Sequence, residues 1–189
     1  MLGGDLEYVI AVVAAVALGY GIWMFNRLVS DRNLVAQAFA DIDAQLKRRA
    51  DLVPQLVETV KAYAAYERQT LQAVVELRAR ASALAERERR PSASRFGTES
   101  ELGASLKRLI LLQENYPQLK ADQNFRDLSA KLVEVEDQLQ HARRFYNGAV
   151  KQYVTRIQTF PDIIVARLLA FRTAAFFETD DRDAVKVSL

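Results

Sequence analysis

Acidic and imidazole side chains gather in one short stretch of the C-terminal half, and these residue types can bind metals or transfer protons. A di-iron centre in a helical bundle takes a Glu-x-x-His pair from each of two helices. Here Gln138 stands three residues before His141, which is the only histidine in the chain. Glu134, Glu136 and Asp137 have the spacing of an exposed helix face, with paired catalytic carboxylates as the alternative. We expect no metal site and no catalytic residue, and we interpret His141 as a residue at the rim of a helix.

Other kinds of reactive site have no signature in the sequence. There is no cysteine, which excludes disulfides, thiolate catalysis and Cys-based zinc sites. Neither a Gly-rich phosphate loop nor a G-x-S-x-G motif occurs. The basic cluster "LKRR" at residues 46–49 lacks adjacent aromatic residues for base stacking, and the net charge is only +2. We interpret this cluster as neutralising the carbonyl end of its own helix, or as a contact for lipid or a partner. We therefore expect no enzymatic activity, no cofactor and no nucleic-acid partner.

The N-terminal segment, residues 1–25, contains an uncharged apolar run from Tyr8 to Phe25. As a helix, about 18 residues extend about 27 Å, which is close to the thickness of the hydrocarbon core of a bilayer. Tyr8 and Trp23 lie near its ends, where aromatic rings prefer the membrane interface. We interpret the run as a transmembrane helix over about residues 8–25.

The charges that flank this run bear on the alternatives and on orientation. A cleaved signal peptide needs basic residues before the run, but Asp5 and Glu7 stand there. A buried core helix is the third interpretation. Arg27 and Arg32 follow the run and no Lys or Arg precedes it, so we expect the N-terminus outside and the body in the cytoplasm. The expected membrane-interface residues are Tyr8, Trp23, Arg27 and Arg32.

The body is expected to be helical, because apolar residues recur every three and four positions from Leu28 onward. Pro54 interrupts this pattern, and a proline is tolerated in the first turn of a helix but costs about 3 kcal/mol inside one. With Asp51 as the N-cap, we predict that one helix ends near Arg49 and that a second runs over about 52–89. A single kinked helix is the alternative.

Two more helices are predicted after a linker at residues 86–100, which contains Pro91, Gly97 and several serines. Thr98 and Glu101 have the spacing of a capping box, which predicts a third helix over about 102–115. Asp122 is the predicted N-cap of a fourth helix, which carries the most regular apolar stripe of the chain.

The predicted fold is all-α: an N-terminal transmembrane helix followed by a long-helix antiparallel four-helix bundle over residues 26–161. Two polar residues, Arg49 and Glu67, fall on the apolar stripe, where they set register or oligomeric state or else extend to the rim. The amphipathic tail, residues 162–189, either closes one end of the bundle or contacts the membrane or a partner. Its candidate contact residues are Ile163, Ile164, Arg167, Leu168, Phe171, Arg172, Phe176 and Phe177.

Three stretches carry a family resemblance: "DIDAQLKRRADLVPQLVETVKAYAAYERQTL", "LGASLKRLILLQENYPQLKADQNF" and "ARRFYNGAVKQYVTRIQTFP". Over roughly residues 26–161 they resemble the LemA family of bacterial membrane proteins. The resemblance implies a single anchor with the N-terminus outside, a cytoplasmic antiparallel helical bundle and no known enzymatic activity. The chain departs from the family in its arginine-rich linker and at Asp162, where the family commonly has glycine.

Two functional hypotheses follow, and an enzyme is a disfavoured third. In the first, the protein is a single-pass helical scaffold that self-associates at the cytoplasmic face of the bacterial inner membrane and organises or remodels it. In the alternative, it is a monomeric adaptor that docks a membrane protease or another membrane partner. The expected partners are membrane lipid and further copies of the chain.

Overall fold

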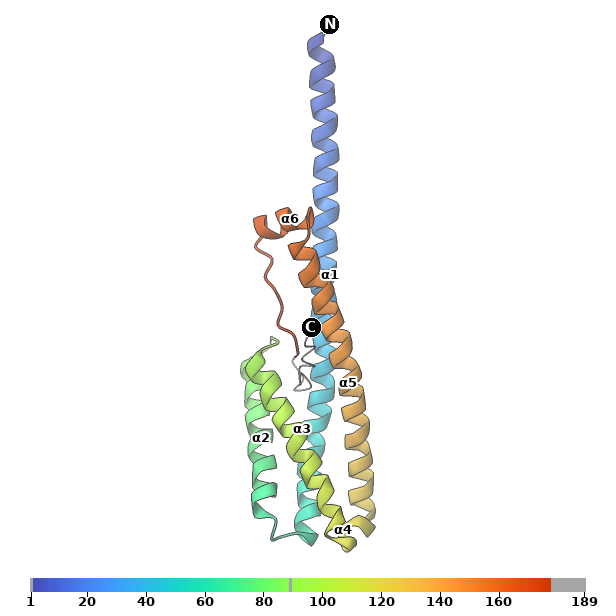
Figure 1. Ribbon diagram of the computed structural model, residues 1–189, viewed down its shortest axis with the longest axis vertical. Coiled ribbons are helices and arrows are strands. Elements are labelled where there is room, and N and C mark those ends of the chain that lie inside the picture. The colour runs from blue at the N-terminus through green and yellow to red at the C-terminus, as the bar shows by residue number, and fades with distance from the viewer. Residues whose placement is uncertain (1, 89, 178–189) are drawn as a thin grey trace, which may run out of the picture. The chain divides into compact units, whose positions relative to one another are not determined.

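The computed structural model describes residues 2–88 and 90–177, in which every regular element is a helix and no strand occurs (Figure 1). The elements are α1 (Leu2–Tyr63), α2 (Arg68–Arg87), α3 (Ala93–Leu111), the 3-10 turn η1 (Leu112–Glu114), α4 (Pro117–Ala121), α5 (Gln123–Gln158) and α6 (Asp162–Leu168). The predicted all-helical class and the long apolar N-terminal helix are confirmed. Arg89, the predicted end of a helix, and residues 178–189 of the predicted tail lie outside the described residues.

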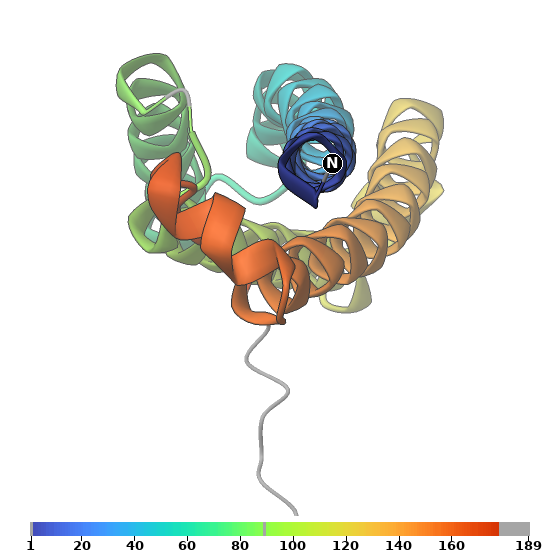
Figure 2. The ribbon, with the colours of Figure 1, turned by 90° about the horizontal axis from the view of Figure 1, so that it is seen from above.

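The chain divides into two compact units, and the two longest helices contribute to both. Among the described residues, unit 1 comprises residues 2–38 and 148–174, and unit 2 comprises residues 39–88, 90–147 and 175–177. Unit 1 therefore holds the N-terminal part of α1, the end of α5 and α6. Unit 2 holds the rest of α1 and α5 together with α2, α3 and α4. Within unit 2, α1 lies between α2 and α5 in both views (Figures 1 and 2).

Unit 2 has an apolar core to which all of its α-helices contribute. The three- and four-residue spacing expected from the sequence places one side of α1 in this core, where Val53, Leu56 and Val60 are fully buried. Phe125 of α5 and Leu109 of α3 are equally inaccessible. The same cluster of buried residues also includes Ala64, Leu71, Val74, Ala81, Leu102, Leu106, Leu119, Leu128 and Leu132.

Pro54 lies inside α1 rather than at a corner, so the predicted helix end near Arg49 and helix start near Leu52 are wrong. A proline removes the hydrogen bond to the carbonyl four residues before it, which here belongs to Ala50. That carbonyl oxygen instead accepts a hydrogen bond from Nε of Arg78 in α2, at 3.0 Å. A side chain from a neighbouring helix thus satisfies the group that the proline leaves unpaired, and α1 continues.

The break between α1 and α2 lies at residues 64–67, inside what was predicted to be one helix. No glycine or proline marks it. Ala64 is fully buried, whereas Tyr66 is 94% exposed. Glu67 occupies the N-cap position of α2, and its carboxylate accepts a hydrogen bond from the Tyr116 hydroxyl at 3.1 Å. The polar residue on the apolar stripe therefore marks a helix start.

The third helix, α3, begins earlier than predicted and includes much of the expected linker. Ser92 is its N-cap, and Oγ accepts a hydrogen bond from the Arg95 backbone N–H at 3.2 Å. The predicted capping box of Thr98 and Glu101 is wrong, because both residues lie inside α3. The Thr98 hydroxyl donates instead to a backbone carbonyl one turn earlier.

The predicted N-cap of the fourth long helix, α5, is confirmed. Asp122 Oδ1 accepts the backbone N–H of Phe125 at 2.8 Å. The Tyr63 hydroxyl donates to the other carboxylate oxygen at 3.0 Å. Both bonds, the backbone bond first, lower the pKa of Asp122, because they favour its ionised form.

Candidate functional site

The N-terminal part of α1 exposes apolar side chains on all sides. Val9 is 58% exposed, and Val16 and Leu18 are each 68% exposed. Among the described residues, α1 is the one helix long and apolar enough to cross a membrane. Exposed apolar surface on this scale is unfavourable in water and is typical of an interaction surface.

Aromatic side chains lie at both ends of this apolar stretch, and basic side chains follow its C-terminal end. Tyr8 is 79% exposed. At the other end Tyr20 stacks on Trp23, with ring centroids 5.7 Å apart. The Arg27 guanidinium lies over the Trp23 ring, 5.1 Å from its centroid. Trp23 and Arg27, both predicted interface residues, therefore form one cation–π pair.

The first part of the tail packs on the same unit. The Phe171 ring meets Phe25 edge-on, with centroids 6.2 Å apart, and the Arg32 guanidinium lies 5.5 Å from the centroid of Phe171. The Tyr153 hydroxyl donates to the Arg172 carbonyl at 2.9 Å. Three of the predicted site residues therefore make contacts within unit 1, namely Arg32, Phe171 and Arg172.

Helix α6 leaves two of its large apolar side chains exposed. Ala166 is buried, whereas Ile164 is 58% exposed and Leu168 is 81% exposed. Arg167 is exposed beside them, and Ile163 is half-buried. Unit 1 therefore presents a surface that combines apolar and basic side chains, and we call Ile164, Arg167 and Leu168 the α6 surface.

The end of the described tail belongs to unit 2. Phe177 is buried, with its ring 4.0 Å from that of Phe96 and the Arg143 guanidinium 4.4 Å from its centroid. Asn147 holds the backbone of Phe177 at both polar groups: Oδ1 accepts its N–H at 2.8 Å, and Nδ2 donates to its carbonyl at 2.9 Å. Phe176 is 43% exposed. The predicted contact set is thus divided between the two units, and Phe177 has an internal partner.

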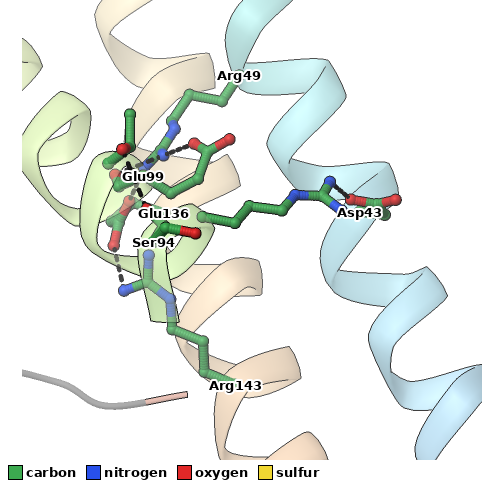
Figure 3. Close-up of polar contacts among 8 residues, drawn as sticks. Asp43, Arg49, Ser94, Glu99, Glu136 and Arg143 are labelled. Carbon is green, nitrogen blue, oxygen red and sulfur yellow. Dashed lines mark hydrogen bonds and ion pairs between the residues drawn. The ribbon is translucent and has the colours of Figure 1, made fainter. Parts of the chain in front are cut away.

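Unit 2 also buries a group of ionic side chains, which Figure 3 shows between α1, α3 and α5. Arg49 is 2% exposed, and its Nη2 contacts Glu99 twice, at 2.5 Å to the carboxylate and at 2.8 Å to the backbone carbonyl. Its Nη1 lies 3.3 Å from the Glu136 carboxylate. A Cβ at Gly103 would lie 3.1 Å from Nη1, so this glycine makes room for the guanidinium. The polar position that Arg49 occupies on the stripe is therefore interior.

Arg143 completes this group, which we call the ionic cluster of Arg49, Glu99, Glu136 and Arg143. Its Nη1 lies 3.5 Å from the Glu136 carboxylate. Burial lowers the pKa of Arg143, while the nearby Glu136 opposes that shift. The cluster alternates basic and acidic groups, so its chemistry is that of a paired structural network joining three helices.

Arg95 of α3 also links this helix to α1. Arg95 pairs with Asp43, and its guanidinium lies 5.1 Å from the centroid of Phe39. Its Nη1 also donates to the Glu88 carbonyl at 3.2 Å. Sequence reasoning missed Arg95, because it placed this residue in a linker, and it missed Glu99 for the same reason. The position of Arg49 on the apolar stripe was the one signal for the cluster.

Of the residues first considered for chemistry, Glu134, Asp137 and His141 lie at the surface, whereas Glu136 is half-buried and belongs to the ionic cluster, so its predicted place on an exposed helix face is wrong. His141 is exposed, and its Nδ1 is 2.7 Å from the Arg144 guanidinium. Glu134 forms an exposed pair with Arg48 at 3.5 Å. The described residues contain no group of three or more His, Cys, Asp or Glu side chains placed to hold a metal ion.

Comparisons with known proteins identify relatives of the chain. A sequence profile described as the LemA family matches residues 38–189. "Protein LemA" of Metamycoplasma hominis is 26% identical over 162 residues, which cover 86% of this chain and 72% of that protein. "Magnetosome protein MamQ 2" of Paramagnetospirillum magneticum is 29% identical over 83 residues, or 44% of this chain and 30% of that protein. MamQ of Magnetospirillum gryphiswaldense matches over 82 residues at 24% identity, again 30% of its length.

Proposed function

The chain belongs to the LemA family, and from this premise we propose that it is a membrane-anchored helical scaffold that self-associates at the cytoplasmic face of the bacterial inner membrane. In this proposal the protein works by packing surfaces and has no enzymatic activity. Its partners are membrane lipid and further copies of the same chain, and their assembly organises or remodels the membrane.

One observation carries the proposal: α1 runs without a break from the exposed apolar stretch into the core of unit 2. A single helix, Leu2–Tyr63, contains both Val16, which is 68% exposed, and Val60, which is fully buried. The apolar stretch fits a lipid environment and the C-terminal part fits a protein interior. Because no loop separates them, one helix supplies both the apolar stretch and part of the core of unit 2.

Orientation and topology are the finer parts of the proposal. Arg27 and Arg32 follow the apolar stretch, and no Lys or Arg precedes it in the sequence, which supports a cytoplasmic body. The long amphipathic helices of residues 26–161 would then form an antiparallel four-helix bundle below the membrane. The α6 surface offers apolar contact area for lipid or for a neighbouring copy.

Cysteine labelling tests the anchoring, since the chain contains no cysteine of its own. Gly3→Cys marks the N-terminus, and Ala65→Cys marks the exposed turn between α1 and α2. In spheroplasts, a membrane-impermeant maleimide should label Gly3→Cys at once and Ala65→Cys only after lysis. Equal labelling of the two variants before lysis would refute the orientation, and recovery of both in the soluble fraction would refute the anchor.

Mass measurement of the full chain in lipid nanodiscs tests self-association. We expect oligomers that persist on dilution, and fewer of them in the double variant Ile164→Gln/Leu168→Gln. Val133→Gln is the matched control, because Val133 is a 55% exposed apolar residue of α5 in unit 2. A monomer at all concentrations would refute the scaffold, and a stoichiometric foreign protein bound to that monomer would establish the adaptor instead.

A further inference from the structure

Unit 1 contains an open groove of about 550 Å³ to which α1, α5 and the start of α6 contribute. Its lining includes three basic side chains, Arg27 from α1 and Lys151 and Arg156 from α5. Thr155 adds a hydroxyl group, and Gly148 leaves an open place on the wall, because a Cβ there would meet no atom within 4 Å. Basic groups around a hydroxyl are the donors that a phosphate group prefers.

The groove carries an excess of positive charge. Arg156 is paired through Nε with Asp31, and Gln152 Nε2 donates to the same carboxylate at 3.1 Å. Across residues 2–88 and 90–177, no carboxylate lies within ion-pair distance of Arg27 or Lys151. Asp162 is the one acidic residue on the lining. Two basic side chains thus face one carboxylate, and an added anion would balance them.

The position of the groove indicates where that anion comes from. Arg27 is two residues beyond Phe25, the end of the apolar run, and its guanidinium lies over Trp23. Tryptophan at the end of a spanning helix lies at the level of the lipid headgroups. The exposed apolar residues Ile164 and Leu168 follow Asp162 on α6 and offer contact for an acyl chain.

We propose that this groove binds the phosphate of an anionic phospholipid headgroup, with Arg27 and Lys151 as its principal ligands. The inference rests on the proposed membrane anchoring, which places the groove at headgroup level. Phosphatidylglycerol fits the excess charge, since its headgroup is a net anion. Phosphatidylcholine carries a quaternary ammonium group that would be repelled by the same two side chains. A bound lipid would tie α1 to α5 just below the bilayer.

The single tryptophan of the chain is a built-in reporter, because Trp23 lies beneath Arg27. Full-length protein in a non-ionic detergent is titrated with short-chain phosphatidylglycerol, short-chain phosphatidylcholine or inorganic phosphate while Trp23 fluorescence is recorded. We expect a saturable change with phosphatidylglycerol and none with the other two. Lys151→Gln should weaken the binding about fivefold, because one basic residue near an anionic lipid contributes about that factor. Lys131→Gln, the same exchange at an exposed position of α5 in unit 2, should leave it unchanged.

A pair of variants at Gly148 separates charge from bulk. Gly148→Glu and Gly148→Gln add side chains of nearly equal size to the open wall, and both favour the helix over glycine. We expect Gly148→Glu to bind phosphatidylglycerol about fivefold more weakly than Gly148→Gln, since only the former adds a negative charge.

The alternative outcomes each overturn the inference. Equal binding of phosphatidylcholine would show that the groove does not select an anion, and equal binding of inorganic phosphate would show that it is not a lipid site. Titrations that are the same for wild type, Lys151→Gln and Gly148→Glu would place any binding elsewhere. None of these results depends on the spheroplast labelling, so failure of the groove and failure of the membrane anchor are distinguished.

Discussion

The two units differ in where their large apolar side chains lie and in how their charges are paired. In unit 2, Leu56 and Phe125 are fully buried, and the ionic cluster joins three helices. In unit 1, Val16 and Leu168 are largely exposed, and one ion pair, Asp31 with Arg156, links α1 to α5. Unit 2 therefore buries its apolar side chains and pairs its charges internally, as a protein core does, whereas much of the surface of unit 1 suits a non-aqueous environment. This contrast predicts that substitutions inside unit 2 cost more stability than equivalent substitutions in unit 1.

The largest expected effect is that of Arg49→Ala. The substitution leaves the Glu99 carboxylate, 4% exposed in the wild type, without its closest partner. Breaking a buried ion pair from one side costs about 3–5 kcal/mol. Urea titration of the full chain in detergent, followed by the helical circular dichroism signal, measures the free energy of unfolding. Arg48→Ala is the control, because its pair with Glu134 is exposed and contributes below about 1 kcal/mol. Equal losses for the two variants would contradict the role of the ionic cluster.

A second prediction concerns the uninterrupted passage of α1 through Pro54. Arg78→Met leaves the Ala50 carbonyl without its donor and should cost about 1–2 kcal/mol in the same titration. In a Pro54→Ala background, the restored backbone N–H supplies that donor, and Arg78→Met should cost less. Additive effects of the two substitutions would show that Arg78 does not compensate for the proline.

Features of the fold that depend on residues close in the sequence could be predicted, whereas features that depend on contacts with another helix could not. Buried positions of α1 and the Asp122 cap could be predicted, because periodicity and capping are local. The continuity of α1 at Pro54 could not, because its cause is Arg78, which lies on another helix. The break at residues 64–67 contains no glycine or proline, and its one signal in the sequence is the polar Glu67 on the apolar stripe.

The candidate site shows the same limit. The order of apolar, aromatic and basic residues predicts that Trp23 and Arg27 lie at a membrane interface, and this stays a prediction. Glu99 and Arg95 could not be found, since a proline and several serines gave their segment the composition of a linker. Phe177 was grouped with exposed tail residues, because composition does not show that Asn147 holds its backbone.

The third prediction concerns alkaline pH and unit 2. Burial raises the pKa of Tyr146 from 10.0 to about 12, and its hydroxyl donates to the Ala175 carbonyl at 2.6 Å. Because the folded pKa lies above the unfolded one, this group's contribution is complete below pH 10 and is lost as the pH rises through about 12. Tyr146→Phe should lower stability at neutral pH by about 1 kcal/mol and reduce its decline above pH 10. Tyr66→Phe, at a 94% exposed position, is the control and should change neither.

The smallest expected effect lies in unit 1, at the contact of Arg32 with Phe171. This cation–π pair is partly exposed, with 5.5 Å between the guanidinium and the ring centroid, so it should contribute only about 0.5–1 kcal/mol. The Phe171 backbone N–H donates to the Ala166 carbonyl at 2.9 Å, which makes its hydrogen exchange a local measure of whether the tail stays in place. Arg32→Gln should speed that exchange about two- to fivefold, whereas Arg32→Lys, which keeps the charge, should have a smaller effect. Arg32→Gln could instead accelerate this hydrogen exchange as strongly as Arg49→Ala accelerates hydrogen exchange in the core of unit 2. That result would mean that unit 1 depends on internal contacts as much as unit 2 does. The contrast between the units would then fail, and with it the argument that the exposed surface of unit 1 is built for lipid.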